Sequence, residues 1–319
     1  MKNLFLIKSL NFLVILVSLI CVIHTLSAQT SLIRKCETPV TCTLNDICFI
    51  NEKEGWIVGE NNTILHTRDA GTNWEIQSGG GRQILYAVNF VDSLTGWVVG
   101  AKGLILHTTD RGAHWIPQSS GTERWLYAVH FIDNTQGWAV GCGTIIHTND
   151  GGKNWNHQNI ETSYDLYSVC FTDAENGWAV GGGTILNTSD GGKQWNEQEH
   201  EAKGCLYSVC FVNPQVGWVA GDYGTVLHTV DGGSKWNLIK SGREVWLSSI
   251  CFMDKKNGWA AGIIYDSLTA KGVVLSTKDG GYNWNEELKE HPVYSVCFPH
   301  QKCGWMVGEA GAVYNIRQK

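Results

Sequence analysis

Histidines recur at one position of a sequence repeat and are the first candidates for chemistry in this chain of 319 residues. They are His66, His107, His147 and His228, and each directly precedes a threonine. A zinc site would need imidazoles that converge to about 2.0–2.1 Å from the metal. Because each histidine belongs to a different repeat unit, we expect no metal site and no cofactor.

Carboxylates are the second candidates, since glycoside hydrolysis uses two carboxyl groups about 5–9.5 Å apart. None of the acidic residues outside the repeat stands in a recognisable catalytic motif, and the sequence has no Gly-x-Ser-x-Gly, His-Glu-x-x-His or phosphate-binding glycine motif. We therefore expect a protein that is not an enzyme and has no catalytic residues. The alternative is a secreted glycan-active hydrolase of the sialidase-like type. Its candidate carboxylates are Glu60, Asp165, Asp222, Asp266 and Glu309.

A repeat of about 40 residues must position these groups. Gly-Trp pairs occur seven times, at intervals of 40 to 46 residues, and each follows a Leu-Tyr-Ser-Val-Cys-Phe-like run. Self-similarity at this period, with several short strands in each unit, is typical of propeller blades. The sequence predicts an all-β fold, a seven-bladed β-propeller of four-stranded antiparallel blades over residues 29–319. The predicted blades start near residues 46, 85, 126, 166, 206, 247 and 293.

A Thr-x-Asp-x-Gly-x-x-Trp motif lies between the predicted third and fourth strands of six units. Asp and Thr oxygens accept hydrogen bonds from the N–H groups of turns, and glycine supplies the positive φ that a reversal needs. The motif resembles the Asp-box of bacterial sialidase-type propellers. Since a catalytic acid is needed once and not six times, we expect these aspartates to be structural. They are Asp69, Asp110, Asp150, Asp190, Asp231 and Asp279.

The seventh unit lacks a fourth strand, because the chain ends at Lys319 soon after the third. The segment 31–43 precedes the first unit and is not assigned to any other strand. We expect it to pair with the last unit and to close the ring, which removes the exposed sheet edges that promote aggregation.

Residues outside the repeat gather at one end of the predicted blades. In a four-stranded blade, the loops that enter the first strand emerge on the same face as the hairpin between the second and third strands. An insertion at 263–271 opens on this face. Arginine and tryptophan are enriched at binding hot spots. The predicted partner-binding residues are Arg82, Arg124, Trp125, Arg243 and Trp246. In the alternative interpretation, the tryptophans plug the central channel and the arginines are solvated.

The N-terminal segment 1–28 has a basic start, an apolar middle and a small-residue exit, as in a cleaved signal peptide. A retained membrane anchor and a lipoprotein modified at Cys21 are the alternatives. Loss of Lys2 and Lys8 with this segment changes the net charge from −6 to −8. We expect no nucleic-acid partner, because binding to phosphates needs a clustered positive surface. We expect an extracytoplasmic protein located in the periplasm, at the cell surface or in the medium.

Five cysteines share one repeat position, and we expect them to be free thiols because equivalent positions of neighbouring blades should lie too far apart for a disulfide. They are Cys48, Cys170, Cys210, Cys251 and Cys297. Cys36 and Cys42 are the first candidates for a disulfide in an oxidising compartment, but the sequence does not give the connectivity.

The combined motifs identify a family. The runs 126–131, 137–141 and 144–155 show most clearly that the chain resembles the photosystem II stability and assembly factor family. The resemblance covers residues 45–319. It implies a seven-bladed propeller outside the cytoplasm that binds a membrane-protein subunit through an arginine patch. Arg82, Arg124 and Arg243 are the residues that match such a patch. We expect a monomer whose partner is a protein, a membrane-protein subunit or a surface glycan.

Overall fold

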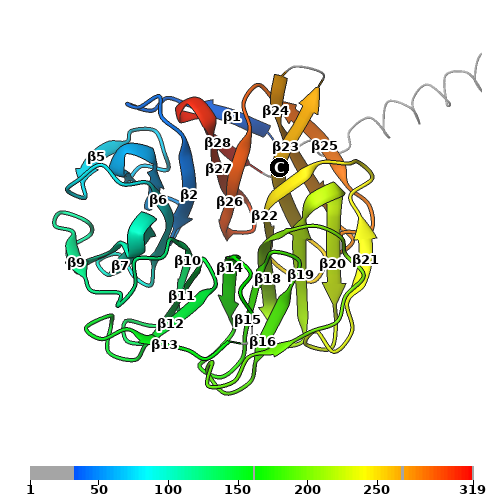
Figure 1. The fold of residues 1–319 in the computed structure, drawn as a ribbon. Helices are drawn as coiled ribbons and strands as arrows, with labels where there is room; N and C mark the ends of the chain where they lie inside the picture. Colours follow the sequence, from blue (N-terminus) through cyan, green and yellow to red (C-terminus); the bar gives the residue numbers. More distant parts are fainter. Residues whose placement is uncertain (1–31, 161, 267–268, 318–319) are drawn as a thin grey trace, which may run out of the picture.

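The computed structural model describes residues 32–160, 162–266 and 269–317, and it consists of seven four-stranded antiparallel sheets arranged in a ring (Figure 1). The predicted fold class, a seven-bladed β-propeller, is confirmed. The predicted signal peptide, 1–28, lies outside the described residues. Within the described part of the chain, no helix is both long enough and apolar enough to cross a membrane.

Each blade begins with an inner strand next to the central channel and continues outward. The inner strands are β2 (Leu44–Phe49), β6 (Leu85–Phe90), β10 (Leu126–Phe131), β14 (Leu166–Phe171), β18 (Leu206–Asn213), β22 (Trp246–Phe252) and β26 (Val293–His300). The second strands are β3 (Gly55–Gly59), β7 (Gly96–Gly100), β11 (Gly137–Gly141), β15 (Gly177–Gly181), β19 (Val216–Gly221), β23 (Gly258–Asp266) and β27 (Cys303–Gly308).

The third strands return to the other face of the ring, and the outer strands are short. The third strands are β4 (Thr63–Thr67), β8 (Ile105–Thr108), β12 (Thr144–Thr148), β16 (Ile185–Thr188), β20 (Thr225–Thr229), β24 (Thr269–Thr277) and β28 (Val313–Arg317). The outer strands are β5 (Glu75–Ser78), β9 (Ile116–Gln118), β13 (Asn156–His157), β17 (Asn196–Glu197), β21 (Asn237–Lys240), β25 (Asn285–Lys289) and β1 (Leu32–Cys36).

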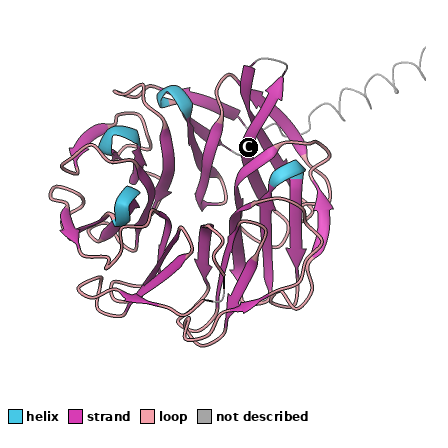
Figure 2. Cartoon of the chain, in the orientation of Figure 1, coloured by secondary structure: helices cyan, strands magenta, loops and turns pink. Residues whose placement is uncertain are grey.

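Four single-turn 3-10 helices lie in hairpins between second and third strands of the described chain (Figure 2). They are η1 (Glu60–Asn62), η2 (Ala101–Gly103), η3 (Asp222–Gly224) and η4 (Glu309–Gly311).

The ring closes through β1, as the sequence predicted. The strand order of the last blade is β1-β28-β27-β26, so its outer strand comes from the beginning of the chain (Figure 1). The pairing of β1 with β28 is antiparallel and runs from Leu32 opposite Arg317 to Cys36 opposite Val313.

The hydrophobic core consists of seven clusters, each formed between two neighbouring blades. In each interface the tryptophan of a second strand stacks on the inner-strand phenylalanine of the next blade. Trp56 and Phe90, for example, have ring centroids 3.5 Å apart with an interplanar angle of 9°. A blade therefore has no complete core of its own, and the blades stabilise one another.

All ten described cysteines are free, including the five at the shared repeat position. Cys210 Sγ accepts the backbone N–H of Phe252 in the next blade, at 3.3 Å. The expected disulfide between Cys36 and Cys42 is wrong. Cys36 lies in the outer strand of the last blade, whereas the Cys42 thiol is 3.2 Å from Thr63 Oγ1 in the first.

Candidate partner-binding face

The ring has two faces that differ in the loops they carry. On one face, the hairpin between second and third strands accepts the loop that enters an inner strand. Glu60 N donates to Thr43 O at 3.0 Å, and Cys142 N donates to Trp125 O at 3.0 Å. We call this the mouth face. The Asp-boxes and the turns that follow the inner strands form the opposite face, which we call the Asp-box face.

The Asp-box aspartates tie their own turns together. In the third blade, Thr148 Oγ1 donates to Asp150 Oδ1 at 2.8 Å, and Asn154 N donates to the same oxygen at 2.9 Å. The side-chain hydrogen bond from Asn154 lowers the pKa of Asp150 to about 2. The threonine and backbone bonds recur at Asp69, Asp110, Asp190, Asp231 and Asp279. All six carboxylates are thus hydrogen-bonded within their own turns.

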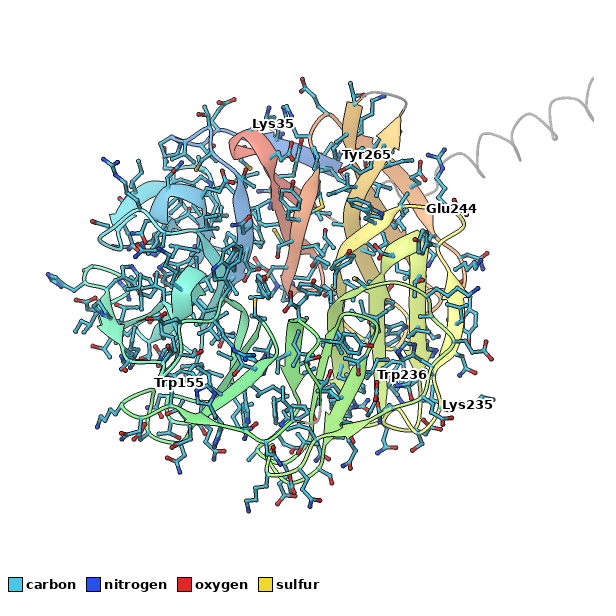
Figure 3. The ribbon with its side chains drawn as sticks, in the orientation of Figure 1. Lys35, Trp155, Lys235, Trp236, Glu244 and Tyr265 are labelled. Carbon is cyan, nitrogen blue, oxygen red and sulfur yellow. The ribbon has the colours of Figure 1, made fainter. Side chains whose placement is uncertain are left out.

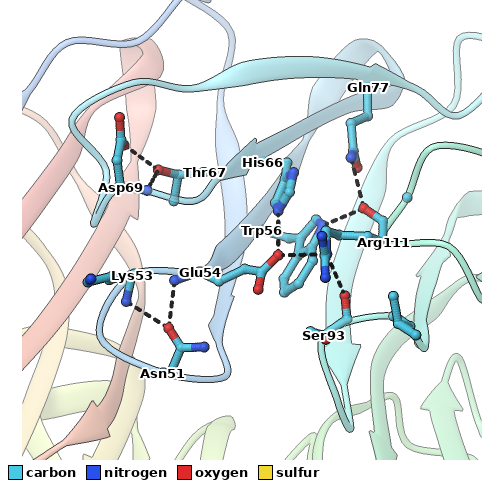
Figure 4. A network of polar contacts seen from close by, with 12 residues as sticks. Asn51, Lys53, Glu54, Trp56, His66, Thr67, Asp69, Gln77, Ser93 and Arg111 are labelled. Carbon is cyan, nitrogen blue, oxygen red and sulfur yellow. Dashed lines mark hydrogen bonds and ion pairs between the residues drawn. The ribbon is translucent and has the colours of Figure 1, made fainter.

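The first two blades are joined on the Asp-box face by a polar network (Figure 4). Glu54 Oε1 lies 3.0 Å from Arg111 Nε and 3.2 Å from His66 Nε2. The carbonyl oxygen of Arg111 accepts hydrogen bonds from Trp56 Nε1 and Gln77 Nε2. These contacts connect the first blade to the second.

The four repeat histidines each stack on the tryptophan of the neighbouring strand, with ring centroids 4.7 to 4.9 Å apart. Burial lowers the pKa of each imidazole. They lie in four separate blades. Among the residues that the structure describes, no group of three His, Cys, Asp or Glu side chains could hold a metal ion.

The three arginines all precede inner strands on the mouth face, but they differ in their surroundings. Arg124 Nη1 donates to the carbonyl oxygens of Cys142 and Gly143 at 2.8 and 2.9 Å. Arg243 Nε lies 3.1 Å from Glu286 Oε2. The side chain of Arg82 is exposed and has no hydrogen bond or ion pair with the described residues. The structure therefore brings these arginines to one face without joining them into one contiguous patch.

The two tryptophans outside the repeat are exposed on the same face. Trp125 is 42% exposed and its ring lies 5.9 Å from that of Tyr86. Trp246 is 45% exposed and packs edge-on against Tyr265, at 5.1 Å. Neither tryptophan is buried as a channel plug would be. Tyr265, labelled in Figure 3, belongs to the extended hairpin of β23 and β24.

Sequence reasoning missed an arc of tyrosines that borders the channel on this face. Tyr86, Tyr127, Tyr167 and Tyr207 come from four consecutive blades, and their ring centroids are 5.2 to 5.4 Å apart. Burial raises the pKa of each hydroxyl group. The signal was visible in the repeat, because each tyrosine follows the first leucine of an inner strand. Strand pairing shifts register at this position, so period-two alternation does not predict where the ring points.

Carboxylates lie beside these phenols. Tyr207 OH donates to Asp222 Oδ1 at 3.1 Å, and Tyr294 OH donates to Glu309 Oε1 at 2.6 Å. The other oxygen of Asp222 accepts the backbone N–H of Cys205 at 2.8 Å. The mouth face thus combines exposed aromatic rings, arginines and oriented carboxylates, which is a surface suited to binding.

Comparisons with known proteins agree with this architecture. A solved structure of YCF48 bound to D1 peptide has a TM-score of 0.75 and 22% sequence identity, covering 92% of this chain and 96% of that one. YCF48 from Cyanidioschyzon merolae has a TM-score of 0.73 and 21% identity, covering 89% of this chain and 98% of that one. At this level of identity the two structures show a shared fold.

Sequence similarity gives the family. The photosystem II assembly protein Ycf48 of Thermosynechococcus vestitus is 46% identical over 39 residues, a stretch that spans 12% of this chain and 11% of the relative's length. A family model described as photosynthesis system II assembly factor YCF48 matches residues 26–117 and 154–290. Because that match extends over more than half of the sequence, this chain belongs to the YCF48 family of photosystem II assembly factors.

Proposed function

We propose that this chain is a non-catalytic, extracytoplasmic binding propeller that holds a protein partner on its mouth face. The proposed contact residues are Arg82, Arg124, Trp125, Arg243 and Trp246. The observation that carries this proposal is the exposure of Trp125 and Trp246 on the face where the arginines lie. Tryptophan and arginine supply most of the energy at many protein interfaces. In the same family, YCF48 binds a D1 peptide, which supports a polypeptide, including a membrane-protein subunit, as the partner here.

The opposite face has a different character, which supports the choice of the mouth. Each Asp-box carboxylate is bonded within its own turn, and the motif repeats in six blades. We propose a structural role for all six aspartates. The leader-like segment 1–28 supports a location outside the cytoplasm.

The test is a crosslinking pull-down from a membrane extract of the host. The wild type is compared with the variant Arg82→Ala/Arg124→Ala/Arg243→Ala. The matched control is Lys153→Ala/Lys193→Ala/Lys235→Ala, which removes the same charge from exposed positions of the Asp-box face. We expect one membrane protein to be captured by the wild type and the control and lost from the arginine variant. Equal capture by all three proteins would refute the proposed contact residues.

A glycan-active hydrolase is the second candidate, and one contact favours it. Sialidase-like chemistry uses a tyrosine nucleophile beside a glutamate, and Tyr294 OH lies 2.6 Å from Glu309 Oε1. Such chemistry also needs an arginine cluster, and within the described part of the chain no arginine forms an ion pair with Glu309. A screen of the protein against fluorogenic glycosides decides the matter. Turnover that Tyr294→Phe abolishes would replace the binding proposal with a hydrolase.

A further inference from the structure

The last blade differs from the other six on the Asp-box face, because its unit has no Asp-box motif. β28 runs from the mouth face to the Asp-box face and reaches Arg317, where other third strands lead into an Asp-box. Leu32, the first residue of β1, lies opposite Arg317 in the antiparallel register (Figure 1). The segment 1–28, predicted to be a signal peptide or a retained anchor, therefore joins the propeller on the Asp-box face.

Basic side chains collect on this face around the start of β1. The turns of the sixth, seventh and first blades contain seven Lys and Arg residues and five acidic residues, over 51–54, 68–73, 254–257, 278–283, 300–302 and 317. The turns of the other four blades contain four basic and eight acidic residues, over 92–95, 109–114, 133–136, 149–154, 173–176, 189–194, 213–215 and 230–235. One side of the face is therefore positive, although the net charge of the chain is −6. We call the seven residues the basic sector: Lys53, Arg68, Lys255, Lys256, Lys278, Lys302 and Arg317.

The charges of the basic sector are exposed and are not balanced within the protein. Among the described residues, none of the seven forms an ion pair. The neighbouring carboxylates have partners of their own. Asp254 Oδ1 accepts the backbone N–H groups of Lys256 and Asn257, and Glu54 is paired with Arg111. These lysines and arginines are therefore available to a ligand outside the protein.

The turns that carry the basic sector are fixed relative to one another. Glu52 Oε1 lies 3.3 Å from His300 Nδ1, which joins the first blade to the seventh. The rings of Trp259 and Phe298 stack at 5.3 Å and join the sixth blade to the seventh. Three neighbouring blades thus present their positive charges at one end of the molecule. Such an array suits an extended surface of negative charge, because many weak attractions add up over it.

We propose that the basic sector binds the anionic phospholipid headgroups of a membrane surface. Lysine and arginine donate charge-assisted hydrogen bonds to phosphate oxygens. The position of the segment 1–28 favours a membrane over other polyanions, because a retained anchor would hold this face against the bilayer. A single apolar anchor and a basic patch also act together in membrane binding. The mouth face would then point away from the bilayer and stay open to its partner. The inference goes beyond the proposed function and uses none of the proposed contact residues.

The test is co-sedimentation with lipid vesicles. It uses the chain that starts at residue 29, which keeps every strand from β1 to β28. One set of vesicles is phosphatidylcholine alone, and the other contains roughly a third phosphatidylglycerol. We expect binding to the second set only, and weaker binding at high salt because of screening. Lys53→Gln/Lys255→Gln/Lys256→Gln/Lys302→Gln, the sector variant, should lower the partition coefficient about tenfold or more.

The matched control is Lys153→Gln/Lys193→Gln/Lys203→Gln/Lys235→Gln, which removes the same charge from exposed lysines outside the basic sector. It should lower the partition coefficient by less than about threefold. Both variants should unfold at the temperature of the wild type, since exposed lysines contribute little to stability.

Three results would overturn the inference: no binding to the phosphatidylglycerol vesicles, equal partition of the wild type and the sector variant, or an equal loss in both variants. Fluorescein-labelled polyglutamate is the probe for the other class of ligand. If it binds and the vesicles do not, the basic sector recognises an acidic polypeptide and the lipid assignment is wrong. The pull-down with the arginine variant reports on the mouth face alone, so either proposal can fail while the other stands.

Discussion

Asp46 departs from its repeat and connects the first blade to both of its neighbours. It occupies an inner-strand position at which most blades have serine or alanine. Its oxygens accept the backbone N–H of Val88 at 3.0 Å and the hydroxyl of Ser295 at 2.7 Å, so it joins the first blade to both neighbours. Burial raises the pKa of Asp46 to about 6, although these hydrogen bonds favour the charged form.

The pKa of Asp46 predicts a pH dependence of stability. In the unfolded chain this carboxyl titrates near pH 3.8, so the folded state binds the proton more tightly. The cost of the buried charge is present above about pH 6 and is relieved as the pH falls from about 6 to about 4. The difference in pKa corresponds to at most about 3 kcal/mol.

Asp46→Asn should remove that dependence while keeping an acceptor for Val88 and a donor for Ser295. We expect the variant to be more stable than the wild type at pH 7.5, and the gap to close as the pH approaches about 4. Urea unfolding at several pH values measures the gap. A gap that stays constant with pH would show that the charge of Asp46 has no special cost.

Residue-level chemistry on the mouth face could be predicted only in part. The position of Arg124 before an inner strand indicated the face on which it lies. Its two bonds to the carbonyl oxygens of Cys142 and Gly143 depend on a tight hairpin in which Gly143 has φ +52°, and the repeat pattern does not specify that geometry. The position of Arg124 in the sequence therefore indicated that it lies on the mouth face. The local backbone decides whether its guanidinium group is hydrogen-bonded within the protein.

At the scale of the strands and turns, a glutamine that follows the Asp-box tryptophan connects each of four blades to the next blade. Gln158 Nε2 donates to Gly191 O at 3.2 Å, while Gln158 Oε1 accepts Trp195 Nε1 at 2.9 Å. The same clamp is formed by Gln77, Gln118 and Gln198. The fifth blade has Ile239 at this position, and in the next blade Trp284 Nε1 is buried without a partner. The recurring glutamine is visible in the sequence, but its partner becomes clear only when the blades are packed.

Gln158→Ala should destabilise the protein by about 1–3 kcal/mol, because it leaves the Trp195 N–H buried and unpaired and removes one donor from Gly191 O. Chemical denaturation measures the change. The control is Gln215→Ala, which shortens an exposed glutamine on the same face and should alter stability by less than about 0.5 kcal/mol. Equal effects of the two substitutions would mean that the clamp contributes nothing.

At the scale of the whole molecule, the sequence was most informative about blade number and ring closure. The Gly-Trp pair occurs once in each repeat of about 40 residues, so counting these pairs gives seven blades. The tryptophan of each pair stacks on the phenylalanine of the next blade, and the seven stacks form a closed cycle of contacts. The last unit needed a fourth strand, and only 31–43 could provide it. The tyrosine arc could not be predicted in the same way, since it exists only after the ring has brought separate blades together.

The pairing of β1 with β28 closes the ring and should stabilise the whole molecule. A variant that lacks residues 1–36 loses every backbone pair between β1 and β28, and Ile316 loses the cover of Ile33. We expect its free energy of unfolding to fall by about 3 kcal/mol or more, which corresponds to a decrease in Tm of roughly 10 °C. The exposed edge of β28 should also pair with other copies, so light scattering should detect oligomers. A variant that lacks residues 1–28 keeps β1 and is the control. If both variants unfold at the same temperature as monomers, the pairing of β1 with β28 does not stabilise the ring, and closure would have to come from the tryptophan–phenylalanine stacks alone.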